Sequence, residues 1–381
     1  MRYVVTGGTG FIGRRLIAEI LSQPGTEAVH VLVRAESLGR FDRLAVGWAD
    51  ERVQPLVGDL TAPDLGLSDG VVDGLGAIDH VVHCAAVYDI TAAEERQRSA
   101  NVEGTRAVIG LARRLDAKLH HVSSIAVAGT HRGVFTEDDF DLGQDLPTPY
   151  HRTKFDAERL VRTADGLRYR IYRPGVVVGD SRTGEMDKVD GPYYFFGVLS
   201  GLARLPRFTP MMLPDTGRTN IVPVDYVVSA MTALMHVDGR DGQTFHLTAP
   251  TTTGLRGIYR GIASAAGLPP LVGSLPRAAA APLLQVGGRA KILRNMAATQ
   301  LGVPAEILDV VDLMPTFRSE LTAEALRGSG ITVPEFGSYA GMLWRYWARH
   351  LDPGRARRDD PAGPLVGKHV IITGASSGIG R

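Results

Sequence analysis

The sequence predicts an α/β protein in which helices cover both faces of a parallel sheet, with a smaller, mainly helical lobe towards the C-terminus. Up to about residue 180, short β-branched runs alternate with helical stretches, and this alternation is typical of a doubly wound parallel sheet. A glycine-rich turn between the first apolar run and the first amphipathic stretch is typical of the beginning of a βαβ unit. Beyond Asp180 the alternation ends, and the chain from Leu255 to His350 is mainly helical in pattern.

Six strands and three helices are expected before residue 180. Each strand is a short run rich in β-branched residues, and each helix carries apolar residues at helical spacing. The strands are expected at Tyr3–Val5, Val29–Val33, Val53–Val57, His80–His83, Lys118–Ser123 and Arg170–Val178, and the helices at Ile12–Leu21, Val102–Leu115 and Pro149–Ala164.

The second half of the chain has a different pattern. A loop rich in Gly, Asp and aromatic residues spans Asp180–Phe196, and a short strand and a helix are expected within Asn220–Met235. Another strand is expected at Thr244–Leu247. The segment Asp352–Pro364 is dense in Pro, Gly, Arg and Asp, which predicts a solvated linker.

The bulk composition excludes several classes of function. The net charge of +1 gives no electrostatic basis for binding nucleic acid or an acidic membrane surface. No apolar run reaches the ~18 residues that a membrane span needs. The single cysteine, Cys84, cannot form an internal disulfide, which fits a reducing cytoplasm. No His or Cys spacing suggests a metal site.

The first glycine-rich turn has the chemistry of a nucleotide-binding loop. The run Thr6–Gly13 contains Gly8-x-Gly10-x-x-Gly13, and Gly7 adds a second reading, Gly-x-x-Gly-x-x-Gly. Glycines allow the tight turn and let a pyrophosphate approach the helix N-terminus. The alternative is a purely structural turn. The candidate cofactor-binding residues of this loop are Gly7, Gly10, Phe11, Ile12 and Gly13.

The end of the second strand predicts which dinucleotide binds. An acidic residue there would bind the ribose 2′-hydroxyl of NAD, but this strand ends in Arg34, with Glu36 two residues later. A guanidinium suits a 2′-phosphate, so NADPH is the expected cofactor, with help from Arg43 and Arg14. The alternative for Arg34 is a solvated cation. After the third strand, Asp59 is expected to contact the adenine amino group or, alternatively, to cap a turn.

A tyrosine and a lysine four residues apart form the candidate catalytic pair. Tyr150 and Lys154 share one face of the predicted helix, and a nearby cation favours the phenolate form of a tyrosine. Lysine is rare here, since 42 residues are Lys or Arg but only five are Lys, so its use at this position is informative. Upstream, Ser123 and Ser124 follow an apolar strand, where a hydroxyl could bind a carbonyl oxygen or merely form a turn.

Together these residues resemble the extended short-chain dehydrogenase/reductase family over roughly residues 1–350. The resemblance implies a Rossmann fold, with Tyr150 as proton donor and Lys154 as its electrostatic partner. It also implies that Ser124 polarises the carbonyl, that Asn101 supports a proton-relay water and that Pro174 lies beside the nicotinamide. The motifs that carry it are the glycine loop, Gly58-Asp59-Leu60, His83-Cys84-Ala85-Ala86, Asn101-Val102-Glu103-Gly104-Thr105, Ser123-Ser124, Tyr150 with Lys154, and Arg173-Pro174-Gly175. The cofactor-binding candidates outside the first loop are Arg34, Arg43, Asp59, Leu60, Ala85, Tyr150, Lys154, Pro174 and Val176.

A narrower resemblance concerns the substrate. Gly179–Gly184 and Val33–Ala35 are similar to the thioester-reductase branch, and Leu343–Leu351 followed by a second glycine signature, Thr373–Gly380, is similar to bacterial bifunctional fatty acyl-CoA reductases. The resemblance implies an NADPH-dependent reductase of a fatty acyl thioester or fatty aldehyde, with a missing C-terminal reductase domain as partner. The expected units are an NADP-binding Rossmann domain at 1–180 with a returning segment at about 220–250, a substrate lobe at 181–350, a linker at 351–366, and the truncated start of a second Rossmann dehydrogenase domain at 367–381.

Other functions remain open at this point. The fold also serves enzymes that act on nucleotide sugars or hydroxysteroids, and a non-catalytic nucleotide-binding module is a third possibility. A homo-oligomer and peripheral membrane contact are compatible with the sequence. An apolar trough for a lipid substrate is expected from Tyr193, Tyr194, Phe195, Phe196, Val198, Leu199, Met211, Met212 and Leu213, with lobe core as the alternative.

Overall fold

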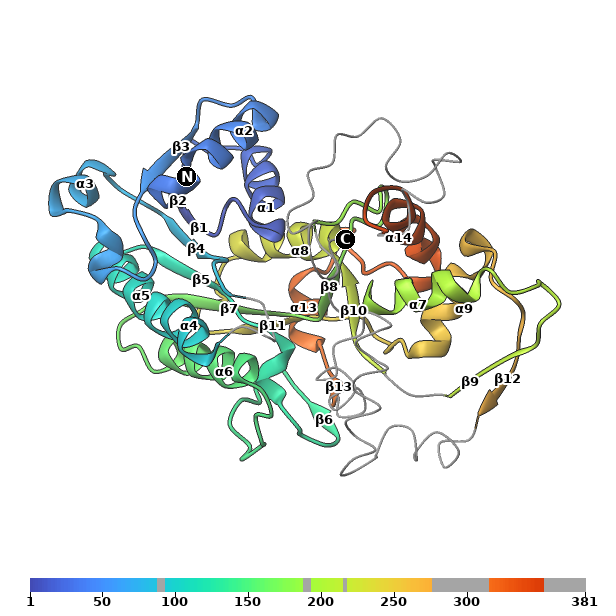
Figure 1. Cartoon of the computed structure of the whole chain (residues 1–381). Coiled ribbons are helices and arrows are strands. Elements are labelled where there is room, and N and C mark those ends of the chain that lie inside the picture. The colour runs from blue at the N-terminus through green and yellow to red at the C-terminus, as the bar shows by residue number, and fades with distance from the viewer. Residues whose placement is uncertain (88–92, 188–192, 215–217, 276–314, 353–381) are drawn as a thin grey trace, which may run out of the picture.

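A seven-stranded parallel sheet forms the centre of the molecule (Figure 1). The computed structural model describes the chain except residues 88–92, 188–192, 215–217, 276–314 and 353–381. The strand order is β3-β2-β1-β4-β5-β7-β11, and every pairing is parallel. The first six strands follow the Rossmann order, so the predicted fold class is confirmed. The strands are β1 (Arg2–Thr6), β2 (Ala28–Val33), β3 (Val53–Val57), β4 (His80–His83), β5 (Lys118–Val122), β7 (Tyr169–Pro174) and β11 (Thr244–Leu247).

The order of the strands reverses beside β1. The chain runs from β1 outwards to β2 and β3 and then returns to β4 on the other side of β1. Thr6, the last residue of β1, is paired with Leu32 of β2 and with His83 of β4, so the ends of these strands are level. Ligands of such sheets bind in the crevice beyond the carboxyl ends at this reversal.

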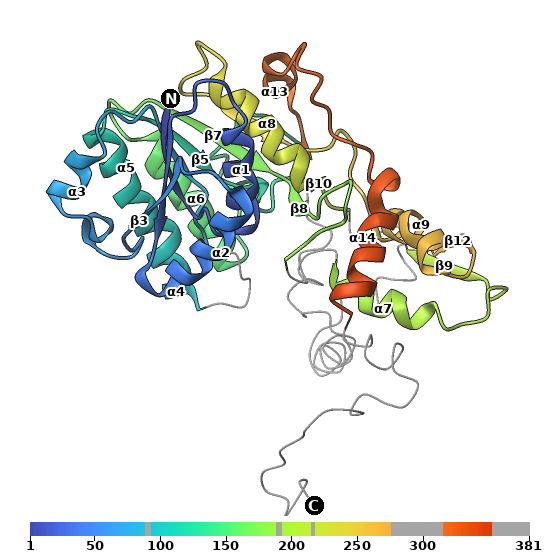
Figure 2. The ribbon, with the colours of Figure 1, turned by 90° about the horizontal axis from the view of Figure 1, so that it is seen from above.

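Helices cover both faces of the sheet, as a doubly wound fold requires. One face is covered by α1 (Phe11–Leu21), α2 (Leu38–Trp48) and α8 (Val224–His236), which share a buried apolar cluster with the strands. The other face is covered by α3 (Asp69–Gly74), α5 (Gly104–Arg114) and α6 (Pro149–Arg162), which share a second cluster. Figure 2 shows α5 and α8 on opposite sides of the strands.

Two boundaries differ from the sequence-based expectation. The expected strand Arg170–Val178 is two strands, β7 and β8 (Val176–Val178), because the chain bends at Gly175. A Cβ at Gly175 would lie 2.7 Å from the carbonyl oxygen of Asn220, so only glycine fits. Strand β8 then pairs with β10 (Ile221–Pro223) outside the main sheet. The expected helix Val102–Leu115 is α5 preceded by α4 (Glu94–Arg98) and a π-helical turn at Ser99–Glu103.

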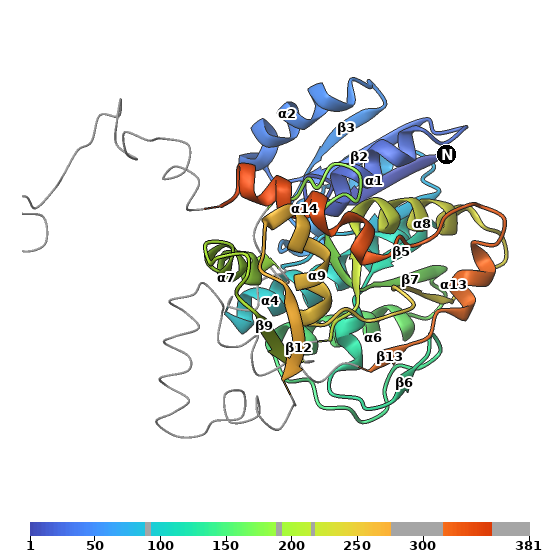
Figure 3. The same ribbon diagram turned by 90° about the vertical axis from the view of Figure 1, so that its right-hand side faces the viewer.

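The lobe packs around three helices, α7 (Tyr194–Leu202), α9 (Leu255–Ala266) and α14 (Phe336–His350) (Figure 3). A parallel strand pair, β9 (Met211–Pro214) with β12 (Leu271–Leu275), was not expected from the sequence. The segment after residue 314 adds β13 (Thr316–Phe317), which pairs with β6 (Val134–Phe135), and α13 (Glu320–Ala325).

The aromatic side chains of the lobe are mostly core. Phe196 is buried between Tyr193 and the indoles of Trp344 and Trp347, with ring centroids 5.2 to 5.7 Å away. This contact holds α14 against α7. Tyr193, Phe196 and Leu199 are therefore core residues, the alternative to the predicted lipid trough. Phe195, Val198, Met211 and Leu213 are half-buried and Met212 is exposed, while the side chain of Tyr194 lies outside the described part of the structure.

Several expectations fall outside the described residues. They are residues 276–314 of the segment expected to be mainly helical, nearly all of the predicted linker, and the second glycine signature. The predicted domain boundaries stay predictions. Within the described residues, no helix is both long and apolar enough to cross a membrane.

Candidate active site

The glycine turn lies against the end of β4. Gly7 has φ +71°, a left-handed conformation that favours glycine, and a Cβ there would lie 2.6 Å from the backbone nitrogen of Ala85. At Gly13 a Cβ would lie 2.2 Å from the carbonyl oxygen of Gly7. Gly10 is the N-cap of α1, whose first turn contains Phe11 and Ile12. The turn is thus a bare backbone surface at a helix N-terminus, which fits a pyrophosphate.

The end of β2 presents a cation to solvent. Arg34 directly follows β2, and its side chain is 57% exposed with Nη1 3.0 Å from Oε1 of Glu36. Arg43 is exposed on α2. Both positions remain accessible to a cofactor phosphate. Arg14 differs, because its Nη2 lies 2.7 Å from Oε1 of Glu185 in the lobe and so holds that loop against α1.

The turn after β3 explains two further candidates. Oδ1 of Asp59 accepts hydrogen bonds from the backbone nitrogen and the hydroxyl of Thr61, each 2.8 Å long. These bonds lower the pKa of Asp59 and cap the turn, while the expected contact with the adenine stays a prediction. Leu60 packs on the start of α5, since a Cβ at Gly104 would lie 2.6 Å from Cγ of Leu60.

Helix α6 carries the tyrosine–lysine pair. The helix begins with Pro149 after the N-cap Thr148, so Tyr150 lies in its first turn and is half-buried. Lys154 follows one turn later and is only 4% exposed. Its Nζ donates a 2.7 Å hydrogen bond to the carbonyl oxygen of Val122, the last residue of β5. Burial lowers the pKa of Lys154 to about 8, although Glu158 and Cys84 act in the opposite direction.

Ser124 and Asn101 lie near the same strand ends. Oγ of Ser124 accepts a 3.2 Å hydrogen bond from the backbone nitrogen of Ala126, and this bond uses only an oxygen lone pair, so the hydroxyl can still donate. Asn101 is buried in the π-helical turn. Its Oδ1 accepts from the nitrogen of Val87 at 2.8 Å, and its Nδ2 donates to the hydroxyl of Thr153 on α6 at 3.1 Å. The Asn101 side chain therefore connects the loop after β4 to the helix of Tyr150.

The buried ion pair between Glu158 of α6 and Arg173 of β7 was not identified from the sequence. Glu158 and Arg173 are both fully buried, with Nη2 of Arg173 2.6 Å from Oε1 of Glu158. Burial raises the pKa of Glu158, but Arg173 and the hydrogen bonds lower it more, to about 2. Ser123 donates to Glu158 at 2.6 Å, so of the two adjacent serines only Ser124 is available to a ligand. One feature of the sequence indicated Glu158: it follows Lys154 by four residues, so both side chains lie on one face of the helix.

The remaining candidates occupy the same edge of the sheet. Pro174 ends β7 and is paired with Leu247 of β11, and Val176 begins β8 directly after the bend. The Cys84 thiol stays protonated, because desolvation raises its pKa to about 12. Within the described residues, no three His, Cys, Asp or Glu side chains converge as metal ligands would.

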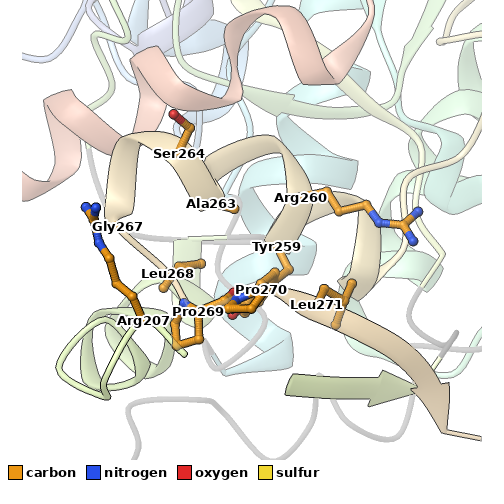
Figure 4. Close-up of a pocket in the computed structure, with 10 residues that line it drawn as sticks. All are labelled: Arg207, Tyr259, Arg260, Ala263, Ser264, Gly267, Leu268, Pro269, Pro270 and Leu271. Carbon is orange, nitrogen blue, oxygen red and sulfur yellow. The ribbon is translucent and has the colours of Figure 1, made fainter. Parts of the chain in front are cut away.

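A pocket of about 590 Å³ lies elsewhere, on the lobe between α9 and β12 (Figure 4). Figure 4 shows the guanidinium of Arg207 next to Gly267 on one side of this pocket and Arg260 on the other. None of the predicted site residues lines it. The candidate active site lies at the carboxyl ends of β1, β4 and β5.

The sheet order, the glycine turn at the reversal beside β1 and the Tyr150–Lys154 helix are those of the extended short-chain dehydrogenase/reductase type. The family model that matches residues 5–231 is that of the NAD-binding family described as male sterility protein, and the chain belongs to this family. The predicted family resemblance is therefore confirmed.

Reductases and peptide synthetases are among the similar proteins. The chain is 32% identical over 273 residues to a nonribosomal peptide synthetase of Aspergillus flavus and, over an equal length, to an aldehyde reductase of the same species. Each match covers 65% of this chain and 26% of the relative, so the chain spans about a quarter of their length. The terminal R domain from the myxalamid PKS-NRPS biosynthetic pathway has a similar structure, with a TM-score of 0.72, 27% identity, and coverage of 91% of this chain and 90% of that one. This chain is accordingly an NAD(P)-binding domain of the thioester- and aldehyde-reductase type.

Proposed function

We propose that this chain is an NADPH-dependent reductase that acts on fatty acyl-CoA thioesters, fatty aldehydes or both. The observation that carries the proposal is Lys154, a buried ammonium one helical turn after Tyr150 and bound to the end of β5. A lysine with a pKa lowered to about 8 is typical of a functional site. The similarity to an aldehyde reductase and to a terminal reductase domain supports the same chemistry.

The residues present fit a dinucleotide with a 2′-phosphate. Gly7 and Gly13 leave no room for a Cβ, so at these positions the loop would present its backbone to the pyrophosphate. Arg34 would bind the 2′-phosphate in place of its contact with Glu36. The bound cofactor supplies the hydride.

Four candidate residues have roles in the proposed reaction. The Tyr150 hydroxyl donates its proton to the carbonyl oxygen of the substrate, where negative charge develops. The Lys154 ammonium, one helical turn after Tyr150, would stabilise the phenolate that remains. Ser124 donates a hydrogen bond to the same oxygen. Asn101 holds the loop after β4 against α6 and supports the water that returns a proton to the site.

The chemistry balances for either substrate. With a thioester, hydride adds to the carbonyl carbon and Tyr150 protonates the oxygen, giving a hemithioacetal. The carbon–sulfur bond then breaks, and the products are an aldehyde and a free thiol. With an aldehyde, the same two transfers give the primary alcohol directly.

A second candidate substrate is an acyl or peptidyl thioester bound to a carrier domain. The observation that favours it is the similarity to a peptide synthetase and to the terminal domain of a synthetase pathway. The residues at the carboxyl ends of β1, β4 and β5 would act identically on either thioester. The two substrates differ in what is attached to the thioester sulfur, coenzyme A in one and a carrier domain in the other.

The test is NADPH oxidation by the purified chain with a long-chain acyl-CoA, the matching aldehyde and the same acyl group on a carrier domain, with NADH as the cofactor control. Turnover of acyl-CoA or aldehyde supports the proposal and shows which step the chain catalyses. Turnover of the carrier-bound thioester alone would replace the fatty acyl-CoA proposal with the second candidate. No oxidation with any of the three would refute the reductase function.

A further inference from the structure

A series of hydrogen bonds connects the strand before the glycine turn to the helix of Tyr150, and His83 lies at its centre. Nδ1 of His83, at the end of β4, lies 2.7 Å from the hydroxyl of Thr6 at the end of β1. Nε2 lies 3.0 Å from the hydroxyl of Thr105 on α5. All three residues are at most 1% exposed. The imidazole thus bridges the strand that leads into the glycine turn and the helix that covers the sheet.

The series of hydrogen bonds continues from Thr105 to the helix of Tyr150. The Thr105 hydroxyl donates a 2.6 Å hydrogen bond to the carbonyl oxygen of Asn101. Asn101 Nδ2 donates to Thr153, and the Thr153 hydroxyl donates to the carbonyl oxygen of Tyr150 at 3.3 Å. At the other end, the backbone nitrogen of Ala85 donates to Thr6 Oγ1 at 3.4 Å.

These contacts fix the tautomer of His83. The Thr105 hydroxyl uses its single proton on Asn101, so its oxygen must accept from Nε2–H of His83. Nδ1 is then the lone-pair nitrogen and accepts from the Thr6 hydroxyl, whose oxygen is left to accept from Ala85. Burial lowers the pKa of His83 to about 3, with a smaller contribution from Lys154, so the ring stays neutral and this pattern persists at neutral pH.

We propose that His83 is a positioning residue for hydride transfer, which sets the distance between the glycine turn and the Tyr150 helix through Thr6 on one side and Thr105 and Asn101 on the other. The inference rests on the proposed reductase function. In the proposed reaction the glycine turn after β1 would hold the cofactor, while α6 and the end of β5 would hold the substrate oxygen. Hydride transfer needs the two in register, and a displacement of about 1 Å can reduce the rate by on the order of a hundredfold.

A second histidine at the same depth provides a matched control. His121 is paired with His83 across β4 and β5, is 1% exposed, and its ring centroid lies 5.5 Å from that of His83. Among the described residues, neither ring nitrogen of His121 has a hydrogen-bond partner. Replacement of His121 therefore removes a buried imidazole but none of the hydrogen bonds that connect the glycine turn to the Tyr150 helix.

The variants remove different hydrogen bonds of the series that runs through His83. His83→Gln keeps a donor towards Thr105, His83→Asn keeps an acceptor towards Thr6, and His83→Leu keeps neither. Thr105→Val cuts the same bridge at its far end, and Thr105→Ser restores the hydroxyl. The measurements are the NADPH dissociation constant, the thermal midpoint, kcat, and the deuterium isotope effect on kcat with NADPH labelled at the transferred position.

We expect His83→Leu and Thr105→Val to reduce kcat by on the order of tenfold to a hundredfold and to raise the isotope effect. The NADPH dissociation constant should change by less than about threefold, Thr105→Ser should recover most of kcat, and His121→Leu should retain it. If His83→Leu does not fold, Thr105→Val decides the question alone.

An unchanged kcat in Thr105→Val, or an equal loss in His121→Leu, would reduce His83 to a packing residue. A wild-type chain that does not oxidise NADPH would refute the proposed function itself, whereas active variants beside an active wild type would refute only the role of His83.

Discussion

Lys154 shows what burial does to a single charged residue in this molecule. The residue is 4% exposed, its ammonium donates to the carbonyl oxygen of Val122, and burial lowers its pKa to about 8. The tyrosine–lysine spacing was evident from the sequence. The depth of the lysine was not, because burial depends on the packing of α6 against β5.

The alkaline limb of the activity should follow Lys154. Because its pKa is lowered to about 8, the side chain is charged below that pH and neutral above it. If the ammonium stabilises the Tyr150 phenolate, kcat should fall as the pH rises through about 8. Lys154→Arg keeps a positive charge throughout this range, so its kcat, although reduced, should not show that decline. A decline near pH 8 that persists in Lys154→Arg would assign the limb to another group.

Arg34 is the residue on which the cofactor preference depends. Its guanidinium is exposed at the end of β2, where it forms an ion pair with Glu36. A charge-assisted hydrogen bond to a phosphate contributes about 1.5–3 kcal/mol, so Arg34→Ala should raise the KM for NADPH by roughly tenfold or more. The KM for NADH should stay within about twofold. Equal effects on both cofactors in steady-state assays would show that Arg34 does not bind the 2′-phosphate.

The packing of helix α6 on the sheet depends on the buried ion pair between its residue Glu158 and Arg173 of β7. Glu158 and Arg173 are both fully buried, and Arg173 also donates to Nε2 of His246 at 3.2 Å. The imidazole can accept because its Nδ1 donates to the carbonyl oxygen of Arg318. Strands β7 and β11 are thereby connected to the helix that carries Tyr150 and Lys154.

Loss of the Glu158 charge should destabilise the protein strongly. Glu158→Gln leaves Arg173 buried without a counter-charge, which should cost about 3–5 kcal/mol in urea unfolding. Asp156→Asn on the same helix removes an exposed contact with Arg159 and should cost no more than about 0.5 kcal/mol. Equal losses in the two variants would contradict the buried-pair account.

The same pair predicts a pH dependence of stability. The pKa of Glu158 is lowered from an ordinary value of 4.5 to about 2 in the folded protein. Its contribution is therefore fully present above pH 4.5 and is lost as the pH falls towards 2. Glu158→Gln should lack this component, so wild type and variant should converge in stability over that interval.

At the scale of the whole molecule, one carboxylate connects distant parts of the chain. Glu137 accepts hydrogen bonds from the nitrogens of His246 on β11 and of Leu321 and Thr322 at the start of α13, at 2.6 to 3.0 Å. All its partners are donors, so Glu137→Gln places an amide NH₂ group where acceptors are needed. We expect a cost of about 1–3 kcal/mol and faster amide exchange in 320–325, whereas Glu320→Gln, at an exposed contact with Arg318, should change neither.

Much of the sheet could be predicted from the sequence, because its strands are short apolar runs and its first turn needs glycine. The split between β7 and β8 could not, since the approach of Asn220 to Gly175 comes from a segment 45 residues later. Helix α2 was not predicted although Leu38, Phe41, Ala45 and Trp48 lie at helical spacing and pack on the core, since its two glycines are poor helix formers. At the site, the spacing of Tyr150 and Lys154 is local, but the Glu158–Arg173 pair and the contacts of His83 join residues that only the folded chain brings together.

The most direct test of the central claim follows the transferred hydrogen. Wild type and Tyr150→Phe are each given NADPH carrying deuterium at the transferred position and a long-chain acyl-CoA, and the products are examined by mass spectrometry. We predict aldehyde or alcohol deuterated at carbon 1 from the wild type and at least a hundredfold less from Tyr150→Phe, since general acid catalysis contributes roughly 10²–10⁴. Unlabelled product, or equal labelling by both proteins, would contradict the account.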